Sequence, residues 1–326
     1  MLKTKYIVII PSYNEQSTIT GCLDSILDAA TATQGYKLEK IIICVNGCTD
    51  QTKQLAQSWK RAPVEVIESA PGYINAMNHL LQYAKKIFPK HILVKTDADS
   101  RVDEQAFSIL FNQLERHSEI IIVGGHPIPI TSLNKNFYRK FMSRLLSVRS
   151  RTPEAEVTVK DTTKFHPYAQ SDPIPTLNGR EEKLKIYFHG RLWSSRSSES
   201  LPQLPKDVIG DDVYLPGWLL SRYGPESMRL DYRAKVMFHP NDSLTRHWKV
   251  YKRIYEDRKI VYETAQFSEY AKACPLRLDW RYILKHNSLS EVIYFTLYAA
   301  IVSVEKISYK YTPYSAKYWK YNEKES

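Results

Sequence analysis

The chain has 326 residues, 43% of them hydrophobic and 25% charged, which is the composition of a globular protein large enough to form a substantial core. Its formal net charge of +11 means that its surface attracts anions such as nucleotide diphosphates, lipid headgroups or nucleic acid. Its four cysteines lack a zinc-binding pattern, which favours reduced, mostly buried thiols in a cytosolic protein.

Strands and helices are expected to alternate through the first half of the chain. β-Branched apolar runs predict buried strands, and apolar residues at helical spacing predict the helices between them. The expected strands are Tyr6–Ile10, Ile41–Val45, Val64–Glu68, Ile92–Thr96 and Ile120–Val123, and the expected helices are Ser17–Ala30, Thr52–Trp59, Ile74–Ile87 and Ala106–Leu114. The alternation predicts an α/β fold, a mainly parallel sheet with helices on both faces. In such sheets ligands bind beyond the carboxyl ends of the strands, so polar residues that follow strands are candidates for a site.

The second half is less regular. Residues 150–182 are rich in Thr, Pro, Asp and Lys and predict a long loop or an acceptor lid. After it we expect a strand at Ile186–Ser195, a helix at Asp212–Tyr223, a strand at Ala234–His239 and a helical, aromatic and basic region beyond Leu244. The longest apolar stretch, Val292–Val304, falls short of the ~20 residues of a membrane-spanning helix, so neither a spanning segment nor a signal peptide is expected.

Polar motifs follow the predicted strands of the first half. They are Pro11–Glu15, Asn46–Thr52, Gly72–Asn78 and Asp97–Asp99, each after the next strand in order. Each is weak alone, because Pro and Asn are common in loops and an aspartate pair often caps a helix. Together they resemble the donor-binding half of family 2 glycosyltransferases, with its P-x-x-N-E, S/C-T-D-x-T, G-x-x-x-A-L/M-N and D-x-D motifs. The resemblance covers residues 5–125 and, more loosely, residues 186–258.

This resemblance implies a GT-A (Rossmann-like) fold and a nucleotide-sugar donor, with UDP as the usual nucleotide. The residues implied in donor binding are Pro11, Tyr13, Glu15, Asn46, Gly72, Asn78, Asp97 and Arg191. Asp99 is implied as a ligand of Mg²⁺ or Mn²⁺, because a hard cation prefers carboxylate oxygens and can bridge the diphosphate. The alternative for Asp97 and Asp99 is capping of the helix expected near Asp103.

Two positions depart from the family pattern. Asn46 stands where the turn is usually acidic, and Tyr73 stands where a Lys or Arg usually follows the glycine. Either change can alter the base preference or the donor affinity without removing the reaction.

The catalytic base is expected in the second half. An inverting transfer needs a carboxylate to take the proton of the acceptor hydroxyl, and the family carries it as the second acid of an E-D pair that opens a helix. Here Asp212 takes that position, and Asp211 is its companion. Helix capping is the alternative for this pair. His239, at the end of the next strand, is a candidate metal ligand, with a structural role as its alternative.

The remaining basic and aromatic segments suggest contact with a membrane. Phe137, Phe141, Leu145 and Val148 recur at helical spacing between basic residues of segment 134–151, and segment 309–321 has the same character. The alternative is a core-packed helix with a solvated face. If both segments contact a membrane, the acceptor could be a lipid-linked glycan intermediate, and a glycan or a small molecule stays open. The absent Q-x-x-R-W motif favours single transfer over polymerisation.

We therefore expect a glycosyltransferase located in the cytoplasm. Peripheral binding at the inner face of the membrane is a further expected location. The expected parts are a donor-binding half at 1–125, an acceptor and catalytic half at 126–243 and a helical extension at 244–326. A sugar-phosphate nucleotidyltransferase is the nearest rival, but it would carry a glycine-rich loop after the first strand. A non-catalytic protein that binds nucleic acid or anionic membrane is a further alternative. Without a nucleic-acid motif, no nucleic-acid partner is expected.

Overall fold

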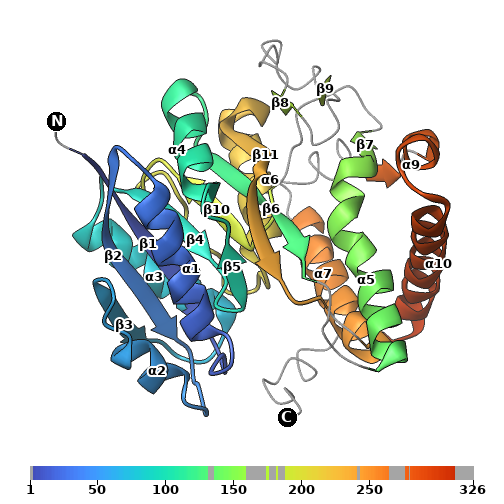
Figure 1. Cartoon of the computed structure of the whole chain (residues 1–326), viewed down its shortest axis with the longest axis horizontal. Coiled ribbons are helices and arrows are strands. Elements are labelled where there is room, and N and C mark those ends of the chain that lie inside the picture. The colour runs from blue at the N-terminus through green and yellow to red at the C-terminus, as the bar shows by residue number, and fades with distance from the viewer. Residues whose placement is uncertain are drawn as a thin grey trace.

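The computed structural model describes residues 3–130, 136–158, 174–175, 181–182, 188–240, 243–263, 276–278 and 280–312. Its centre is an eight-stranded sheet with helices on both faces (Figure 1). The strands are β1 (Thr4–Ser12), β2 (Tyr36–Val45), β3 (Val64–Glu68), β4 (Ile92–Thr96), β5 (Ser100–Val102), β6 (Ile122–Pro129), β10 (Leu192–Ser195) and β11 (Met228–Phe238). The helices are α1 (Ile19–Ala32), α2 (Thr52–Ser58), α3 (Tyr73–Ile87), α4 (Ala106–Arg116), α5 (Phe137–Ala155), α6 (Asp211–Tyr223), α7 (Leu244–Glu263), α9 (Trp280–His286) and α10 (Leu289–Tyr311).

The strand order is β3-β2-β1-β4-β10-β6-β11-β5. The first four strands are parallel and form the half of the sheet where the donor motifs follow strands. β10 then lies antiparallel between β4 and β6, β11 runs parallel to β6, and β5 pairs antiparallel with β11. The sheet is therefore mixed: β10 joins β4 to β6, two strands of the first 130 residues, and β11 extends the sheet beyond β6.

Both faces of the sheet are buried. On β1, Tyr6, Val8 and Ile10 pack into the cluster formed with α1 and α4, whereas Ile7 and Ile9 pack into the opposite cluster formed with α3 and α6. Successive residues of a strand point to opposite faces, so a strand covered on both sides is a continuous apolar run rather than an alternating one.

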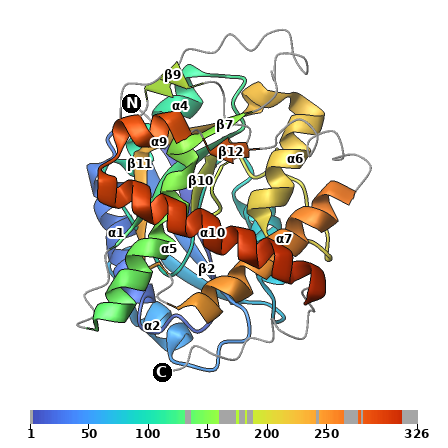
Figure 2. The ribbon, with the colours of Figure 1, turned by 90° about the vertical axis from the view of Figure 1, so that its right-hand side faces the viewer.

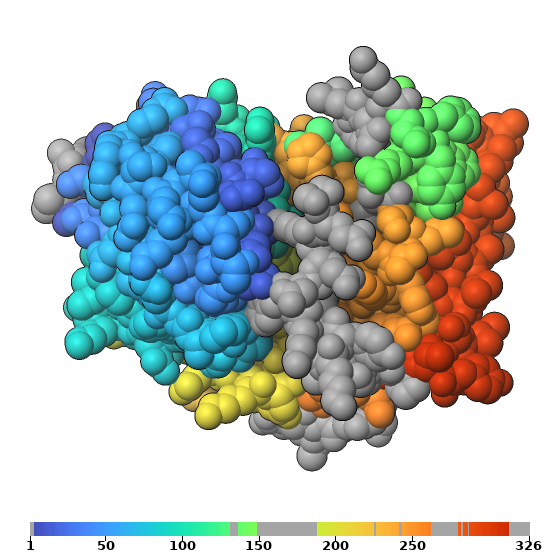
Figure 3. Space-filling model, turned by 90° about the horizontal axis from the view of Figure 1, so that it is seen from below, coloured from blue at the N-terminus to red at the C-terminus, as the bar shows by residue number. Residues whose placement is uncertain are grey.

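A third apolar cluster lies away from the sheet, where α5, α9 and α10 meet. Figure 3 shows the N-terminal elements in blue and cyan on one side of the molecule and α10 in red at the opposite margin. Phe141, Leu145 and Val148 of α5 pack in this cluster. Of the α5 residues predicted to face a membrane, these three are therefore core residues, while Phe137 is 84% exposed. The core-packed alternative holds for most of that stripe.

The predicted α/β fold with a mainly parallel sheet and flanking helices is confirmed, and β3 and β4 have the expected bounds. Several expectations were wrong. The loop expected from residue 150 begins later, because α5 continues to Ala155 and β7 (Glu156–Thr158) pairs with β12 (Leu276–Leu278). Two short strands, β8 (Ile174–Pro175) and β9 (Glu181–Glu182), lie within it, and its other residues are outside the described ones. The strand expected from Ile186 begins at Leu192, and residues 183–187 are also outside the described ones.

The three-part division of the chain stays a prediction. Its first boundary, at residue 125, falls inside β6, so the two halves share one sheet.

Among the described residues Cys22, Cys44 and Cys48 are free, and the first two are buried, as expected; Cys274 lies outside them.

Gly125 is required by the close approach of β6 to its neighbour. A Cβ there would lie 2.6 Å from the backbone oxygen of Ala234 and 2.8 Å from Leu192. We expect Gly125→Ala to lower the free energy of unfolding by about 1–3 kcal/mol, because backbone cannot move aside as a flexible side chain does. Urea denaturation measures the change.

Gly21→Ala is the matched control. The atoms nearest to its Cβ would be those of the Arg101 guanidinium, the closest at 3.0 Å, which is the end of an exposed side chain. This change within α1 should be neutral or stabilising by up to ~1 kcal/mol. Equal losses in both variants would show that the packing at Gly125 is not the cause.

Candidate functional site

The loops after β1 and β2 are bonded to each other at the carboxyl edge of the sheet. The backbone N–H of Thr49 donates to the side-chain oxygen of Asn14 over 2.8 Å, and that of Glu15 donates to the hydroxyl of Thr52 over 2.7 Å. The Glu15 carboxylate accepts the hydroxyl of Thr18 over 2.5 Å. Asn14 is the only non-glycine residue with positive φ in the described part of the chain, at 50°. Asn tolerates this left-handed backbone, and these motif residues fix the two loops together.

Unpartnered polar atoms lie at the ends of three neighbouring strands. Pro11 is buried and Tyr13 is half-buried at the end of β1. Asn46 is buried and donates to the backbone oxygen of Ser12 over 2.9 Å. The Asn46 Oδ1, Ser12 Oγ and Thr96 Oγ1 atoms are buried without a hydrogen-bond partner in the structure. Buried polar groups are seldom left unpaired, so these strand ends offer hydrogen-bonding groups that a bound molecule or water would satisfy.

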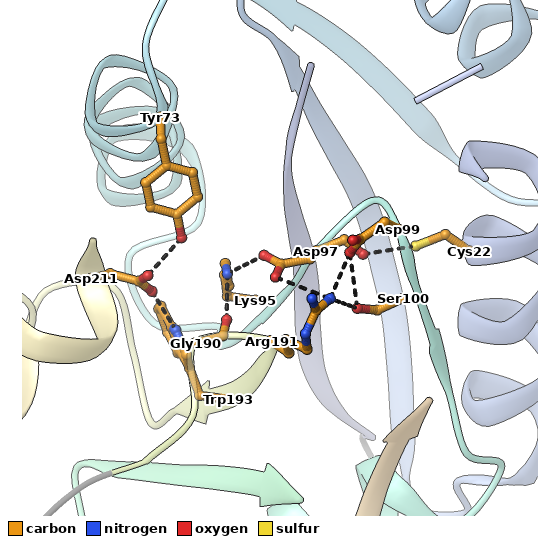
Figure 4. Close-up of polar contacts among 10 residues, drawn as sticks. All are labelled: Cys22, Tyr73, Lys95, Asp97, Asp99, Ser100, Gly190, Arg191, Trp193 and Asp211. Atoms are coloured by element: carbon orange, nitrogen blue, oxygen red, sulfur yellow. Dashed lines mark hydrogen bonds and ion pairs between the residues drawn. The ribbon is translucent and has the colours of Figure 1, made fainter. Parts of the chain in front are cut away.

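Asp97, Asp99 and Arg191 come together between β4 and β10 (Figure 4). The Arg191 guanidinium donates to Asp99 Oδ1 over 2.8 Å and to the hydroxyl of Ser100 over 3.3 Å. It lies 3.9 Å from Asp97 Oδ2 and stacks over the ring of Phe238, with its central carbon 4.1 Å from the ring centre. Two predicted donor-site residues and a predicted metal ligand thus form one charged group.

Lys95 is a buried cation in the same site that the sequence did not single out. Its ammonium group donates to Asp97 Oδ1 over 2.5 Å and to the backbone oxygen of Gly190. Only 1% of the residue is exposed. Burial alone would lower the pKa of Lys95, but the negative charges of Asp211 and Asp97 raise it above its ordinary value. Lys95 is therefore a charged group that links the D-x-D motif to the acid pair of α6.

Asp211 is held by two donors at the start of α6. The hydroxyl of Tyr73 donates to Asp211 Oδ1 over 2.6 Å, and the indole N–H of Trp193 donates to Oδ2 over 2.8 Å (Figure 4). Burial, together with the charge of Asp211, raises the pKa of Tyr73 well above its ordinary value, so the phenol stays protonated as a donor. Both oxygens of Asp211 are occupied, which suits it to orient the acid pair.

Asp212 lies beside a second, buried carboxylate. A Cβ on Gly210 would lie 2.8 Å from Asp212 Oδ1 and 3.2 Å from Oδ2 of Asp257, a residue of α7. Asp257 is 3% exposed and accepts the backbone N–H of Ile209 over 2.8 Å. Burial, with a contribution from the charge of Asp212, raises the pKa of Asp257 to about 7. The predicted base thus has an acidic neighbour whose protonation depends on pH.

The remaining predicted donor residues have structural positions. Gly72 precedes α3 with φ of 127°, a conformation that glycine adopts without strain. Both polar atoms of the Asn78 side chain are used: Nδ2 donates to the backbone oxygen of Leu204, and Oδ1 accepts its N–H, each over 2.8 Å. A contact between Asn78 and the donor would require these bonds to break.

His239 is exposed and directly follows β11. Phe238, the last residue of β11, pairs with Ser100, which follows Asp99 in the chain. No group of three or more His, Cys, Asp or Glu residues suited to a metal occurs in the part of the chain that the structure describes. The Asp97 and Asp99 side chains are 28% and 38% exposed, so these oxygens remain accessible. This set fits a hard cation that takes few protein carboxylates and completes its coordination with phosphate and water.

Comparison with known proteins identifies the family. The model of glycosyl transferase family 2 matches residues 7–171, which is slightly more than half of the chain. The chain belongs to this family.

Its similarity to individual proteins is low. The 4,4'-diaponeurosporenoate glycosyltransferase of Staphylococcus aureus is 27% identical over 135 residues, which are 41% of this chain and only 34% of that relative. One similar solved structure is the glucosyl-3-phosphoglycerate synthase of Mycobacterium tuberculosis in complex with phosphoglyceric acid. The superposed region is 79% of this chain and 80% of the synthase chain, with a TM-score of 0.47 and 17% identity. For the complex of the synthase with Mn²⁺, UDP-glucose and phosphoglyceric acid, the superposed region is 80% of this chain and 79% of the synthase chain, with a TM-score of 0.48 and 16% identity.

Four residues of the site were missed from the sequence. Lys95 stands inside an apolar strand, and a lysine at such a position is the one signal that could have drawn attention to it. Trp193 and Asp257 lie in residues 186–258, where the family resemblance is looser, and neither was assigned a role. Tyr73 was noted only as a departure from the family pattern, without a partner.

Asp257 predicts a pH-dependent stability. Folding raises its pKa from 3.8 to about 7. Between pH 3.8 and about pH 7 the carboxyl is therefore ionised in the unfolded chain but still protonated in the folded protein. This contribution to stability is present at low pH, is lost as the pH rises through about 7 and is constant above it. Asp257→Asn removes it. We expect the free energy of unfolding of the variant, relative to wild type, to rise by about 2–3 kcal/mol from pH 5 to pH 8.

Urea denaturation across this pH range tests the prediction. The matched control is Asp207→Asn, which changes an exposed carboxylate in the segment before α6. The free energy of unfolding of this variant should depend on pH as that of wild type does. If the curves of Asp257→Asn and wild type also stay parallel, the buried carboxyl does not titrate in this range.

Proposed function

We propose that the protein transfers a sugar from a nucleotide-diphosphate sugar, with UDP as the nucleotide, to an acceptor hydroxyl in a single, inverting step of glycan, polysaccharide or glycolipid biosynthesis. One observation carries this proposal. The ammonium group of Lys95 bonds Asp97 of the D-x-D motif, and its pKa is raised by Asp211 and, to a smaller extent, Asp212 of the acid pair. The two acidic motifs that the family uses for donor and acceptor chemistry thus act on one buried cation.

The donor would bind at the carboxyl ends of β1, β2 and β4. The base and ribose would meet Pro11, Tyr13 and Asn46, where buried polar atoms lack partners. Mn²⁺ or Mg²⁺, held by Asp99 with His239 as a further candidate ligand, would neutralise the diphosphate. Arg191 donates to Asp99, and its guanidinium would also help to neutralise the negative charge of the diphosphate.

Asp212 would act as the general base on the acceptor hydroxyl. Asp211 cannot approach a substrate without losing its bonds to Tyr73 and Trp193, so it would orient the start of α6 instead. The proton of the acceptor would pass to the Asp212 carboxylate as the oxygen attacks the anomeric carbon, and the nucleotide diphosphate would leave.

The acceptor would be a glycan, a lipid-linked intermediate or a small molecule. The proposed location is the cytoplasm, with peripheral contact to an anionic membrane at its inner face. The net charge of +11 supports the attraction to an anionic surface.

Calorimetric titration tests the donor site. We expect one of UDP, GDP and CDP, with UDP favoured, to bind in the presence of Mn²⁺ and to bind about tenfold or more weakly to Asp99→Ala, because the carboxylate supplies the metal's ligand. Glu104→Ala, which removes an exposed acid nearby, should leave binding unchanged. Failure of all three nucleotides to bind, with or without metal, would contradict the proposal.

Asp212→Asn tests the proposed base. Loss of a general base should lower the rate of nucleotide release from the donor sugar by roughly 10²–10⁴-fold while nucleotide affinity stays within about twofold. Single-turnover assays with sugar esters of the nucleotide identified by titration measure this, with exposed Asp207→Asn as the control. A variant that keeps its rate would exclude Asp212 as the base.

A further inference from the structure

Helix α10 has one face committed to the protein. Phe295, Tyr298 and Tyr309 are buried, and the first two pack in the cluster shared with α5 and α9. Near the C-terminal end, the Glu305 carboxylate lies 2.8 Å from Nδ1 of His247 on α7, with both side chains buried. The hydroxyl of Tyr309 donates to Glu256, also on α7. This face is therefore fixed by apolar packing and by buried polar contacts.

The opposite face of α10 is an exposed apolar stripe. Its residues recur every three or four positions and so lie on one side of the helix. They are Leu289 (78% exposed), Ile293 (51%), Leu297 (42%), Ala300, Val304 (65%), Ile307 (60%) and Tyr311 (81%). Figure 2 shows α10 as the outermost element on this side of the molecule, in front of α5 and α7. Apolar side chains gathered in this way usually mark an interaction surface.

The charges beside the stripe are basic. The exposed charged residues of α9 and α10 in the described part of the chain are Arg281, Lys285, Lys306 and Lys310. The two acids of these helices face other groups: Glu291 closes the capping box with Ser288, and Glu305 is buried against His247. An apolar stripe with cations beside it matches the interface of an anionic membrane, where apolar side chains enter the headgroup region and lysines meet lipid phosphates.

By length and composition α10 could also cross a membrane, and it is the one described helix for which this holds. The helix extends beyond Val292–Val304, so the length of that apolar stretch does not decide the question, and the expectation that no segment spans a membrane stays a prediction. Such a result is weak evidence by itself, since core helices of soluble proteins pass the same test. Spanning would separate Glu305 from His247 and place the Glu305 carboxylate in hydrocarbon without this partner, which is costly. A helix that lies along the membrane keeps these contacts.

We propose that the outer face of α10, with Arg281 and Lys285 of α9, docks the protein on an anionic lipid surface with the helix parallel to the membrane plane. A second copy of the chain fits less well. Paired helices are oriented by opposite charges beside the apolar seam, and this stripe is accompanied by exposed lysines without an exposed acid to meet them. The proposal does not depend on the donor or the reaction.

Docking through α10 would hold the candidate site at a fixed place relative to the lipid. Glu256 of α7 bonds Tyr309 of α10, and the next residue, Asp257, bonds the backbone of Ile209 just before α6. Helix α7 thus contacts both the inner face of α10 and the segment just before Asp212. An acceptor that reaches the enzyme from the membrane would arrive beside a site already oriented to it.

Vesicle flotation of the full chain tests the proposal. We expect binding to phosphatidylcholine vesicles with about one third phosphatidylglycerol, and at least about tenfold weaker binding to phosphatidylcholine alone or in about 0.5 M salt. Val304→Asp/Ile307→Asp should weaken binding to anionic vesicles at least about tenfold, because two apolar contacts are lost and two negative charges face the lipid. Lys306→Gln/Lys310→Gln should weaken binding several-fold to anionic vesicles alone.

Matched controls lie on α3, at the far side of the molecule from α10 (Figure 1). Ile87→Asp and Lys86→Gln change an apolar residue (48% exposed) and an exposed lysine there and should bind like wild type. Nucleotide titration and thermal unfolding of every variant should match wild type, which separates this test from that of the donor site. The proposal is overturned if wild type does not float with anionic vesicles, if the α10 variants bind unchanged, or if the stripe variant abolishes a lipid-independent dimer.

Discussion

The ammonium group of Lys95 is surrounded by negative charge in the interior of the protein. It bonds Asp97, which precedes the carboxylate proposed to bind metal, and it bonds the backbone of Gly190 at the turn before β10. Its pKa is kept high by Asp211 and Asp97. A buried charge needs partners of opposite sign, and buried carboxylates need a cation. The first and second halves of the chain therefore depend on one side chain for their electrostatic balance at the site.

This arrangement explains why Tyr73 is compatible with the site although the family usually has a basic residue there. The cation is supplied by Lys95, whose nitrogen lies 5.5 Å from the centre of the Tyr73 ring. The phenol is then free to donate to Asp211, which a lysine at the same place would instead neutralise. In this protein the positive charge lies on β4 rather than at the start of α3, and the acid pair has a neutral donor.

The fold could be predicted largely from local patterns, and the site only in part. The continuous apolar runs of β1 and β4 signal strands buried on both faces, and the D-x-D and Asp211–Asp212 motifs follow from residue order alone. Lys95 with Gly190, and Tyr73 with Asp211, join residues far apart in sequence, and no spacing rule reports such pairs. The antiparallel insertion of β10 between β4 and β6 creates them. One sequence without homologues carries no signal for that insertion.

Helix α10 shows the same limit in another form. Its apolar residues fill both the inner and the outer face, so hydropathy alone cannot divide them, and the aromatic and basic pattern of α5 was the more obvious candidate for a membrane surface. The division comes from tertiary contacts: Glu305 meets His247 and Tyr309 meets Glu256, which commits one face to α7 and leaves Val304 and Ile307 outside. Two polar pairs therefore decide which apolar residues form the core and which remain available to a partner. Glu256 and Asp257 are consecutive residues of α7. The contact of Glu256 with Tyr309, which fixes the orientation of α10, is therefore next to the contact of Asp257 with Ile209, which fixes the start of α6.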